Sequence, residues 1–283
     1  MKIEKILAGI DFGKDSGSVL AYASHFAKIF GATVNLLYVI DYLTTPPAYL
    51  IPYIEEEKKI AEKKINELKK QLSDSGISSE TEIIVGRLQE SFGAATKKKN
   101  ADMLVLGFMS HALRRSSSEK LIKSLQMPML VIRGAKAETS KTGAIHIGKI
   151  LCPTDFSDMS VTALKVAREL KEVLSSKLDV IHISSDYEIE KIKTLEHKER
   201  AIQELREKAK NNLDEFLHNH TIWGKVIIGE GKPERKIVAF AAENDTDLIV
   251  IGARGLGLIK GMLIGSVTDA ILKTSPCPVL VIH

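Results

Sequence analysis

A glycine-rich stretch near the end of the chain, IGARGLGLIKGMLIGS at residues 251–266, has residue types and a spacing that suit anion binding. Four glycines fall between residues 252 and 261, directly after an apolar run, and a Gly-Ser pair opens the next apolar run. Glycine is costly in regular structure and is kept where the backbone needs a positive φ or lies very close to something. We therefore expect a ligand to lie against this loop.

The order of the glycines suits a chain of phosphates. The pattern is Gly252, two residues, Gly255, nine residues, then Gly265 and Ser266. Glycines leave backbone N–H groups accessible to an anion. Ser266 and Val267 would add the unpaired N–H groups and the positive dipole end of a helix. A nucleoside triphosphate fits such a cradle.

Two charged residues and two rival motifs bear on this prediction. Arg254 and Lys260 either supply countercharge to phosphates or simply point to water. The pattern GxGxxG belongs after the first strand of a dinucleotide-binding unit, whereas this loop comes later in its domain. The pattern GxxxxGK[ST] needs a lysine where this chain has Gly265. The stretch DFGKDSGS (11–18) lacks the leading Ser-Gly pair of a pyrophosphatase loop and is better interpreted as a helix N-cap.

The chain repeats itself over most of its length. The segment KILAGIDFGKDS (5–16) returns as KILCPTDFSDMS (149–160), an offset of 144 residues that pairs Asp11 with Asp155. Three later blocks match in the same order: 34–40 with 178–184, 101–107 with 246–252, and 127–132 with 277–282. Two long tandem copies indicate a duplicated domain rather than a solenoid.

Each copy alternates short apolar runs with longer helical patterns, which is typical of βαβ units in a parallel sheet covered on both faces. We predict two tandem doubly wound α/β domains, Rossmann-like or flavodoxin-like, each with a five-stranded, mainly parallel sheet. The domains span 1–140 and 146–283, and residues 134–148 form the linker. In the second copy we expect a long helix at 190–218 and strands at 149–153, 178–183, 225–229, 247–252 and 279–282.

This architecture brings two parts of the second copy together. In open α/β sheets, ligands bind at the carboxyl ends of strands, where the connections diverge to opposite faces. The first strand ends at PTD (153–155), and the glycine loop leaves the fourth strand at the same edge, so Asp155 should face the loop across a crevice. Ser157 or Asp158 can cap the helix that follows.

The glycine pattern, with PTDFS (153–157) and SPCPVLVI (275–282), resembles the universal stress protein family over nearly the whole chain. The resemblance implies that an adenine nucleotide, usually ATP, places its phosphates in the glycine loop. It implies that Pro153, Thr154 and Asp155 lie near the base and near a Mg²⁺ ion that accompanies the nucleotide, and that Ile183 lines the adenine.

The resemblance also implies pairing between domains. The family's last strand commonly pairs two domains edge to edge, and here residues 129–133 and 279–283 could pair within one chain. Each strand would otherwise be an exposed apolar edge. A homodimer is a further expectation.

The first copy departs from the pattern at the loop. Gly107 persists, but the counterpart stretch GFMSHALRRSSSEKL has Ser110 in place of the second glycine and is five residues shorter. Counted back from the shared proline, Arg115 and Ser116 take the positions of the glycine and serine that open the second copy's helix. A shortened loop with bulky side chains cannot wrap a triphosphate in the same way, so we expect only the second domain to bind ATP.

Composition narrows the class of protein. The chain of 283 residues is 44% hydrophobic and 27% charged, and no apolar run approaches the roughly 18 residues of a membrane span. Acids at positions 4 and 11 leave no room for a secretory signal, so we expect a cytoplasmic protein without membrane insertion. The net charge is +5 over 1–143 and −1 over 144–283, and the basic residues alternate with acidic ones, so nucleic-acid binding is not expected.

No catalytic constellation stands out. His182 lies in a predicted strand as a buried or half-buried histidine, His218 and His220 lack a third metal ligand, and Ser266 lacks an adjacent base. We therefore predict a stress-response protein that binds ATP and acts as a signalling or protective module, with weak ATP hydrolysis at most. The alternatives are a scaffold or small-ligand carrier with a vestigial glycine loop, and a slow ATPase.

Overall fold

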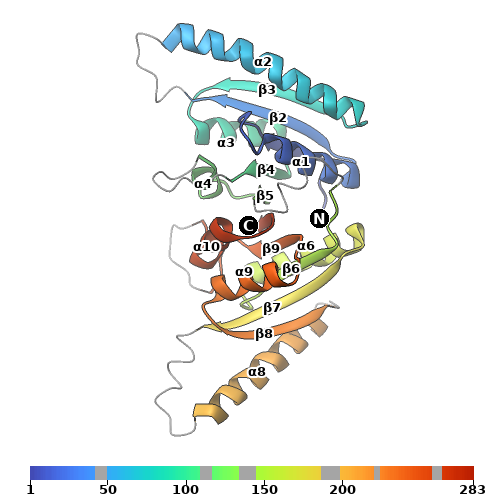
Figure 1. Ribbon diagram of the computed structural model, residues 1–283, viewed down its shortest axis with the longest axis vertical. Coiled ribbons are helices and arrows are strands. Elements are labelled where there is room, and N and C mark those ends of the chain that lie inside the picture. Colours follow the sequence, from blue (N-terminus) through green and yellow to red (C-terminus); the bar gives the residue numbers. More distant parts are fainter. Residues whose placement is uncertain (42–49, 109–116, 134–144, 186–197, 220–223, 257–262) are drawn as a thin grey trace. The chain divides into compact units, whose positions relative to one another are not determined.

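The computed structural model describes residues 1–41, 50–108, 117–133, 145–185, 198–219, 224–256 and 263–283. The chain forms two compact units, Met1–Ile145 and His146–His283. Each unit is one parallel sheet with helices on both sides (Figure 1), which confirms the predicted fold class. Among the residues described, no helix has the length and hydropathy needed to cross a membrane.

The first unit has the strand order β3-β2-β1-β4-β5, and its neighbouring strands are parallel. Its elements are β1 (Lys5–Gly9), α1 (Ser16–Phe30), β2 (Thr33–Ile40), α2 (Leu50–Asp74), β3 (Ser79–Val85), α3 (Leu88–Lys99), β4 (Met103–Gly107), α4 (Ser117–Ile122) and β5 (Met129–Ile132).

The second unit repeats this order as β8-β7-β6-β9-β10, again with parallel neighbours. Its elements are β6 (Lys149–Pro153), α6 (Asp158–Leu174), β7 (Lys177–Ser185), α8 (Lys198–Asn219), β8 (Lys225–Gly231), α9 (Pro233–Glu243), β9 (Leu248–Gly252), α10 (Ser266–Thr274) and β10 (Val279–Ile282). The five predicted strands agree with these bounds to within two residues. Of the helix predicted at 190–218, residues 190–197 lie outside the described residues.

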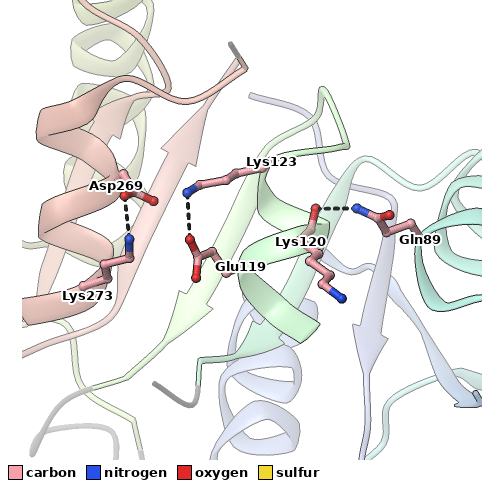
Figure 2. A network of polar contacts seen from close by, with 6 residues as sticks. All are labelled: Gln89, Glu119, Lys120, Lys123, Asp269 and Lys273. Atoms are coloured by element: carbon pink, nitrogen blue, oxygen red, sulfur yellow. Dashed lines mark hydrogen bonds and ion pairs between the residues drawn. The ribbon is translucent and has the colours of Figure 1, made fainter. Parts of the chain in front are cut away.

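The strand order is that of the first five strands of a Rossmann fold rather than that of flavodoxin. Right-handed crossovers place α1 and α2 on one face of the first sheet and α3 and α4 on the other. In agreement, the side chain of Gln89 in α3 donates a hydrogen bond to the carbonyl of Lys120 in α4 (3.1 Å, Figure 2). In each unit the connections diverge between the first and fourth strands, β1 and β4 or β6 and β9.

The central strands are buried throughout because both faces are covered. In β9, the sequence LIVIG is buried at every position, and in β4 the sequence MLVLG is buried up to its final glycine. Continuous apolar runs of this kind are expected of a parallel sheet between two helical layers. This packing holds the carboxyl ends of these strands rigidly. A ligand site at that edge of the sheet would therefore have a fixed geometry.

Candidate functional site

Asp155 lies directly beyond β6, at the point where the strand order of the second unit reverses. Its Oδ2 accepts a hydrogen bond from the N–H of Leu256 in the glycine loop (2.9 Å). Its Oδ1 accepts hydrogen bonds from the N–H (3.1 Å) and the hydroxyl (2.6 Å) of Ser157. The carboxylate therefore joins the end of β6 to the beginning of the glycine loop, in the facing arrangement that the sequence suggested.

The turn after Asp155 is held by a strained aromatic residue. Phe156 has a φ of 66°, a left-handed conformation that costs a non-glycine residue roughly 1–2 kcal/mol. Its ring packs against His182 (centroids 4.7 Å apart) and edge-on against Phe216 of α8 (5.6 Å). Of the two possible helix caps, Ser157 is the one used, since its side chain accepts a hydrogen bond from the N–H of Ser160. Aromatic packing thus offsets the strain of a turn that orients Asp155.

Pro153 and Thr154 are buried, and the polar groups of Thr154 have hydrogen-bond partners within the protein. The N–H of Thr154 donates to the carbonyl of Ile181 (2.9 Å), and its hydroxyl pairs with that of Ser160 (3.0 Å). Its carbonyl bonds to Nδ1 of His182 (2.9 Å), a half-buried histidine as predicted. Pro153 and Thr154 therefore form a buried, hydrogen-bonded support for Asp155, the next residue in the chain.

Close packing explains two of the three motif glycines in the described residues. At Gly252, a Cβ would lie 2.9 Å from the backbone carbonyl carbon of Met159, so close packing of α6 requires glycine. At Gly255, a Cβ would lie 2.0 Å from Oδ2 of Asp155, so the contact across the switch point requires glycine. At Gly265, φ is −74° and ψ is 160°, and the nearest atom to a Cβ would be 3.5 Å away. Neither backbone conformation nor crowding among the described atoms explains Gly265.

Helix α10 begins with N–H groups that have no acceptor within the helix. Gly265 is the N-cap and supplies no side chain, and the first helical hydrogen bond runs from the N–H of Asp269 to the carbonyl of Gly265 (2.9 Å). The N–H groups of Ser266, Val267 and Thr268 therefore have no acceptor within the helix. These donors and the helix dipole favour an anion at this end.

The beginning of α10 is fixed to β9. The hydroxyl of Thr268 donates to the carbonyl of Gly252 (2.9 Å), and the N–H of Gly265 donates to the carbonyl of Ala253 (2.8 Å). Asp269, an acidic residue in the first turn, forms an ion pair with Lys273 (2.7 Å, Figure 2). This pairing offsets a negative charge that would oppose an anion.

Arg254 and Ile183 lie near the same edge of the second sheet. Burial, together with the charge of Arg254, lowers the pKa of His283 to about 4. The Cα of Arg254 lies 3.5 Å from where a Cβ at Gly265 would stand, so Arg254 is beside the beginning of α10. Ile183 is buried in β7, two residues beyond Ile181, the register partner of Pro153. Lys260 lies outside the described residues, as do the glycines at 257 and 261.

The described residues contain no group of three or more His, Cys, Asp or Glu side chains that could hold a metal ion. Asp155 could therefore contribute to Mg²⁺ binding only together with oxygen ligands from elsewhere, such as the phosphates of a nucleotide. The backbone at Gly255 lies so close to Asp155 that a Cβ would overlap Oδ2 of the carboxylate, which fits a site in which the loop backbone approaches that carboxylate closely.

The first unit keeps part of this arrangement. Oδ1 of Asp11 accepts hydrogen bonds from the N–H of Gly13 and the hydroxyl of Ser16 (both 2.8 Å). At Gly107, a Cβ would lie 3.3 Å from Cβ of Asp15 in the α1 N-cap, so helix packing explains the retained glycine. The altered loop positions at 110, 115 and 116 lie outside the described residues.

The residue after the fourth strand differs between the units. Phe108 stands where the second unit has Ala253, and only 7% of its surface is exposed. The guanidinium of Arg133 lies 5.3 Å from the centre of the Phe108 ring. The first unit therefore has a bulky ring, covered by a charged side chain, where the second unit has a methyl group.

The repeated strand order defines a tandem Rossmann-like protein, and in its second unit Asp155 and the glycine loop meet at the switch point. The sequence profile of the Universal stress protein family (Usp) matches residues 2–133 and 146–283. The chain therefore belongs to this family and carries two copies of its domain.

Individual relatives agree with this assignment. Universal stress protein MJ0577 of Methanocaldococcus jannaschii is 33% identical over 151 residues, which cover 47% of this chain and 93% of that protein. Universal stress protein Mb2028c of Mycobacterium bovis is 24% identical over 298 residues, covering 98% of this chain and 96% of that protein. A crystal structure of a universal stress protein from Archaeoglobus fulgidus has a TM-score of 0.75 at 23% identity, covering 99% and 96% of the two chains, and shows the same fold.

Proposed function

We propose that the second domain, residues 146–283, binds ATP at the carboxyl end of β6 and β9, and that the protein acts in stress response as a nucleotide-dependent signalling or protective module. The observation that carries this proposal is Gly265. No described atom crowds a side chain there and the backbone is ordinary. Glycine is favoured at an N-cap, and a closely approaching ligand gives a further physical reason to have no side chain at this position.

The surrounding groups support a triphosphate at that position. The N–H groups at the beginning of α10 face no helical acceptor, and Arg254 supplies a positive charge nearby. Asp155 holds the loop and can share a Mg²⁺ ion with the phosphates. Ile183 offers a buried apolar surface for the adenine.

The proposal assigns no nucleotide to the first domain, residues 1–140. Asp11 bonds locally, and Phe108 adds a buried ring beside the strand end. We propose a structural or regulatory role for this domain. The proposal also includes a cytoplasmic location, pairing of residues 129–133 with 279–283, association into a homodimer, and at most weak ATP hydrolysis.

Calorimetric titration of the full chain with ATP and Mg²⁺ tests the function. Wild type should show saturable binding, and Gly265→Val should abolish it because the valine side chain blocks close approach. Gly17→Val is the matched control, since no atom lies within 4 Å of a Cβ at Gly17 in the first unit. Circular dichroism should show the same fold in all three proteins. Equal ATP affinity in wild type and Gly265→Val would exclude ATP binding at this site. If wild type binds a small molecule that is not a nucleotide and does not bind ATP, the protein is better explained as a carrier.

A further inference from the structure

Gly229 in β8 accommodates the side chain of Ile183 in the neighbouring strand β7. The two residues are register partners, and a Cβ at Gly229 would lie 2.7 Å from Cδ1 of Ile183. Gly229 is not among the described residues with positive φ, so its conformation does not require glycine. Glycine weakens the interior of a strand and often marks a close approach. A Cβ at Gly229 would therefore require the end of the Ile183 side chain to shift.

The first unit has the opposite arrangement at the same register position. There Val39 in β2 pairs with Ile84 in β3, whereas the second unit pairs Ile183 with Gly229. The larger side chain stands on the outer strand in the first unit and on the inner strand in the second. The outer strand therefore carries an isoleucine in the first unit and a glycine without a side chain in the second. The second unit is also the one that contains the glycine loop.

The direction in which Ile183 leans is set by the sheet order. Strand β7 lies between β8 and β6, and Asp155 follows β6. Because Cδ1 of Ile183 occupies the space above Gly229, the side chain leans toward β8 and away from β6, the strand that Asp155 follows. A side chain at position 229 would push Cδ1 back toward β6.

We propose that Gly229 is a specificity-determining residue, which together with Ile183 sets the width of the space for a purine base in the second unit. This inference rests on the proposed function, since it assumes that the base lies over Ile183. It adds a residue of the edge strand β8, far from the glycine loop in sequence, to the determinants of the ligand. The triphosphate would bind at the glycine loop and the beginning of α10, so phosphate binding should not depend on position 229.

The test compares three ligands on the full chain by calorimetry: ATP, CTP and inorganic tripolyphosphate, each with Mg²⁺. We expect Gly229→Ala to weaken ATP binding by up to about tenfold, the lower end of the effect of one substrate methylene in an apolar pocket, because the flexible end of Ile183 can give way in part. The smaller base of CTP should lose less, and tripolyphosphate should change less than about twofold, because its contacts do not reach Ile183. Adding Ile183→Val removes Cδ1 and should restore most of the ATP affinity and the melting temperature lost by Gly229→Ala alone.

Ile84→Ala is the matched control, because it alters the corresponding outer strand of the first unit. It should lower the melting temperature without changing ATP affinity. Equal weakening of all three ligands by Gly229→Ala, or no rescue by Ile183→Val, would overturn the specificity role while leaving ATP binding intact. A wild-type protein that binds no ATP would overturn both the proposed function and this inference.

Discussion

The carboxylate of Asp155 accepts hydrogen bonds from two segments that are far apart in the sequence, Ser157 beside it and Leu256 in the loop beyond β9. Asp11 also binds its own turn, but the described partners of its Oδ1 are all local. The two aspartates therefore occupy corresponding positions in the repeat, but only Asp155 has a described hydrogen bond to the loop beyond the fourth strand. This difference can be measured by removing the charge from each.

We expect Asp155→Asn to lower the free energy of unfolding by about 1–3 kcal/mol, because a bond to a charged acceptor is lost and the loop is released. The same change should weaken ATP binding. Asp11→Asn should cost less stability and leave ATP affinity unchanged. Urea unfolding and calorimetric titration of both variants provide the measurement, and an equal effect of the two substitutions would contradict this account.

His283 makes stability depend on pH. Its Nε2 is buried without a hydrogen-bond partner among the described atoms, and burial with the charge of Arg254 lowers its pKa from 6.5 to about 4. Between these two pH values the unfolded chain binds more protons than the folded one, so the free energy of unfolding should fall as the pH is lowered from 6.5 to 4.

His283→Gln removes this titration. We expect the difference in unfolding free energy between pH near neutrality and pH near the folded pKa to be smaller in the variant than in wild type. Urea unfolding at both pH values measures it. If the variant keeps the full pH dependence of wild type, other groups are responsible.

Helix packing explains the first glycine of the motif at the scale of elements. Gly252 allows the backbone of α6 to approach β9, and Gly107 does the same more loosely for α1 and β4. Gly252→Ala should therefore lower the unfolding free energy by about 1–3 kcal/mol through overpacking, and Gly107→Ala by less. Thermal unfolding without nucleotide tests this, since a glycine kept only for ligand binding would tolerate alanine in the empty protein.

The elements themselves were largely predictable from hydrophobic periodicity. Strands such as 149–153 and 279–282 were found at their observed bounds because continuous apolar runs between turn signals mark buried strands. The choice between Rossmann and flavodoxin order was not predictable. Strand order depends on the direction of each crossover, which no local pattern encodes.

The candidate site was predictable only in part, for a similar reason. The spacing of Gly255 and Gly265 pointed to the loop, and the repeat pointed to Asp155. The donor that joins them is the backbone N–H of Leu256, and a backbone group has no sequence signature. The contact between Ile183 and Gly229 depends on strand register, which becomes visible only once β7 and β8 are paired.

At the scale of the whole molecule, the difference between the two units predicts a stoichiometry. Native mass spectrometry of the full chain should show one ATP per 31.2 kDa polypeptide. The reason is that only the second unit combines Asp155, the glycine loop and the helix beginning at Ser266. Two nucleotides per chain would contradict the assignment of a structural role to the first unit.

The shared close approach of α1 to Gly107 and of α6 to Gly252 has a consequence for cataloguing duplicated proteins of this kind. A glycine at the end of the fourth strand reflects close packing of a helix on the sheet. A search pattern that includes this glycine would therefore give the first unit a partial match to a nucleotide-binding motif. Under the proposed function, the diagnostic position is Gly265, where no described atom would crowd a side chain.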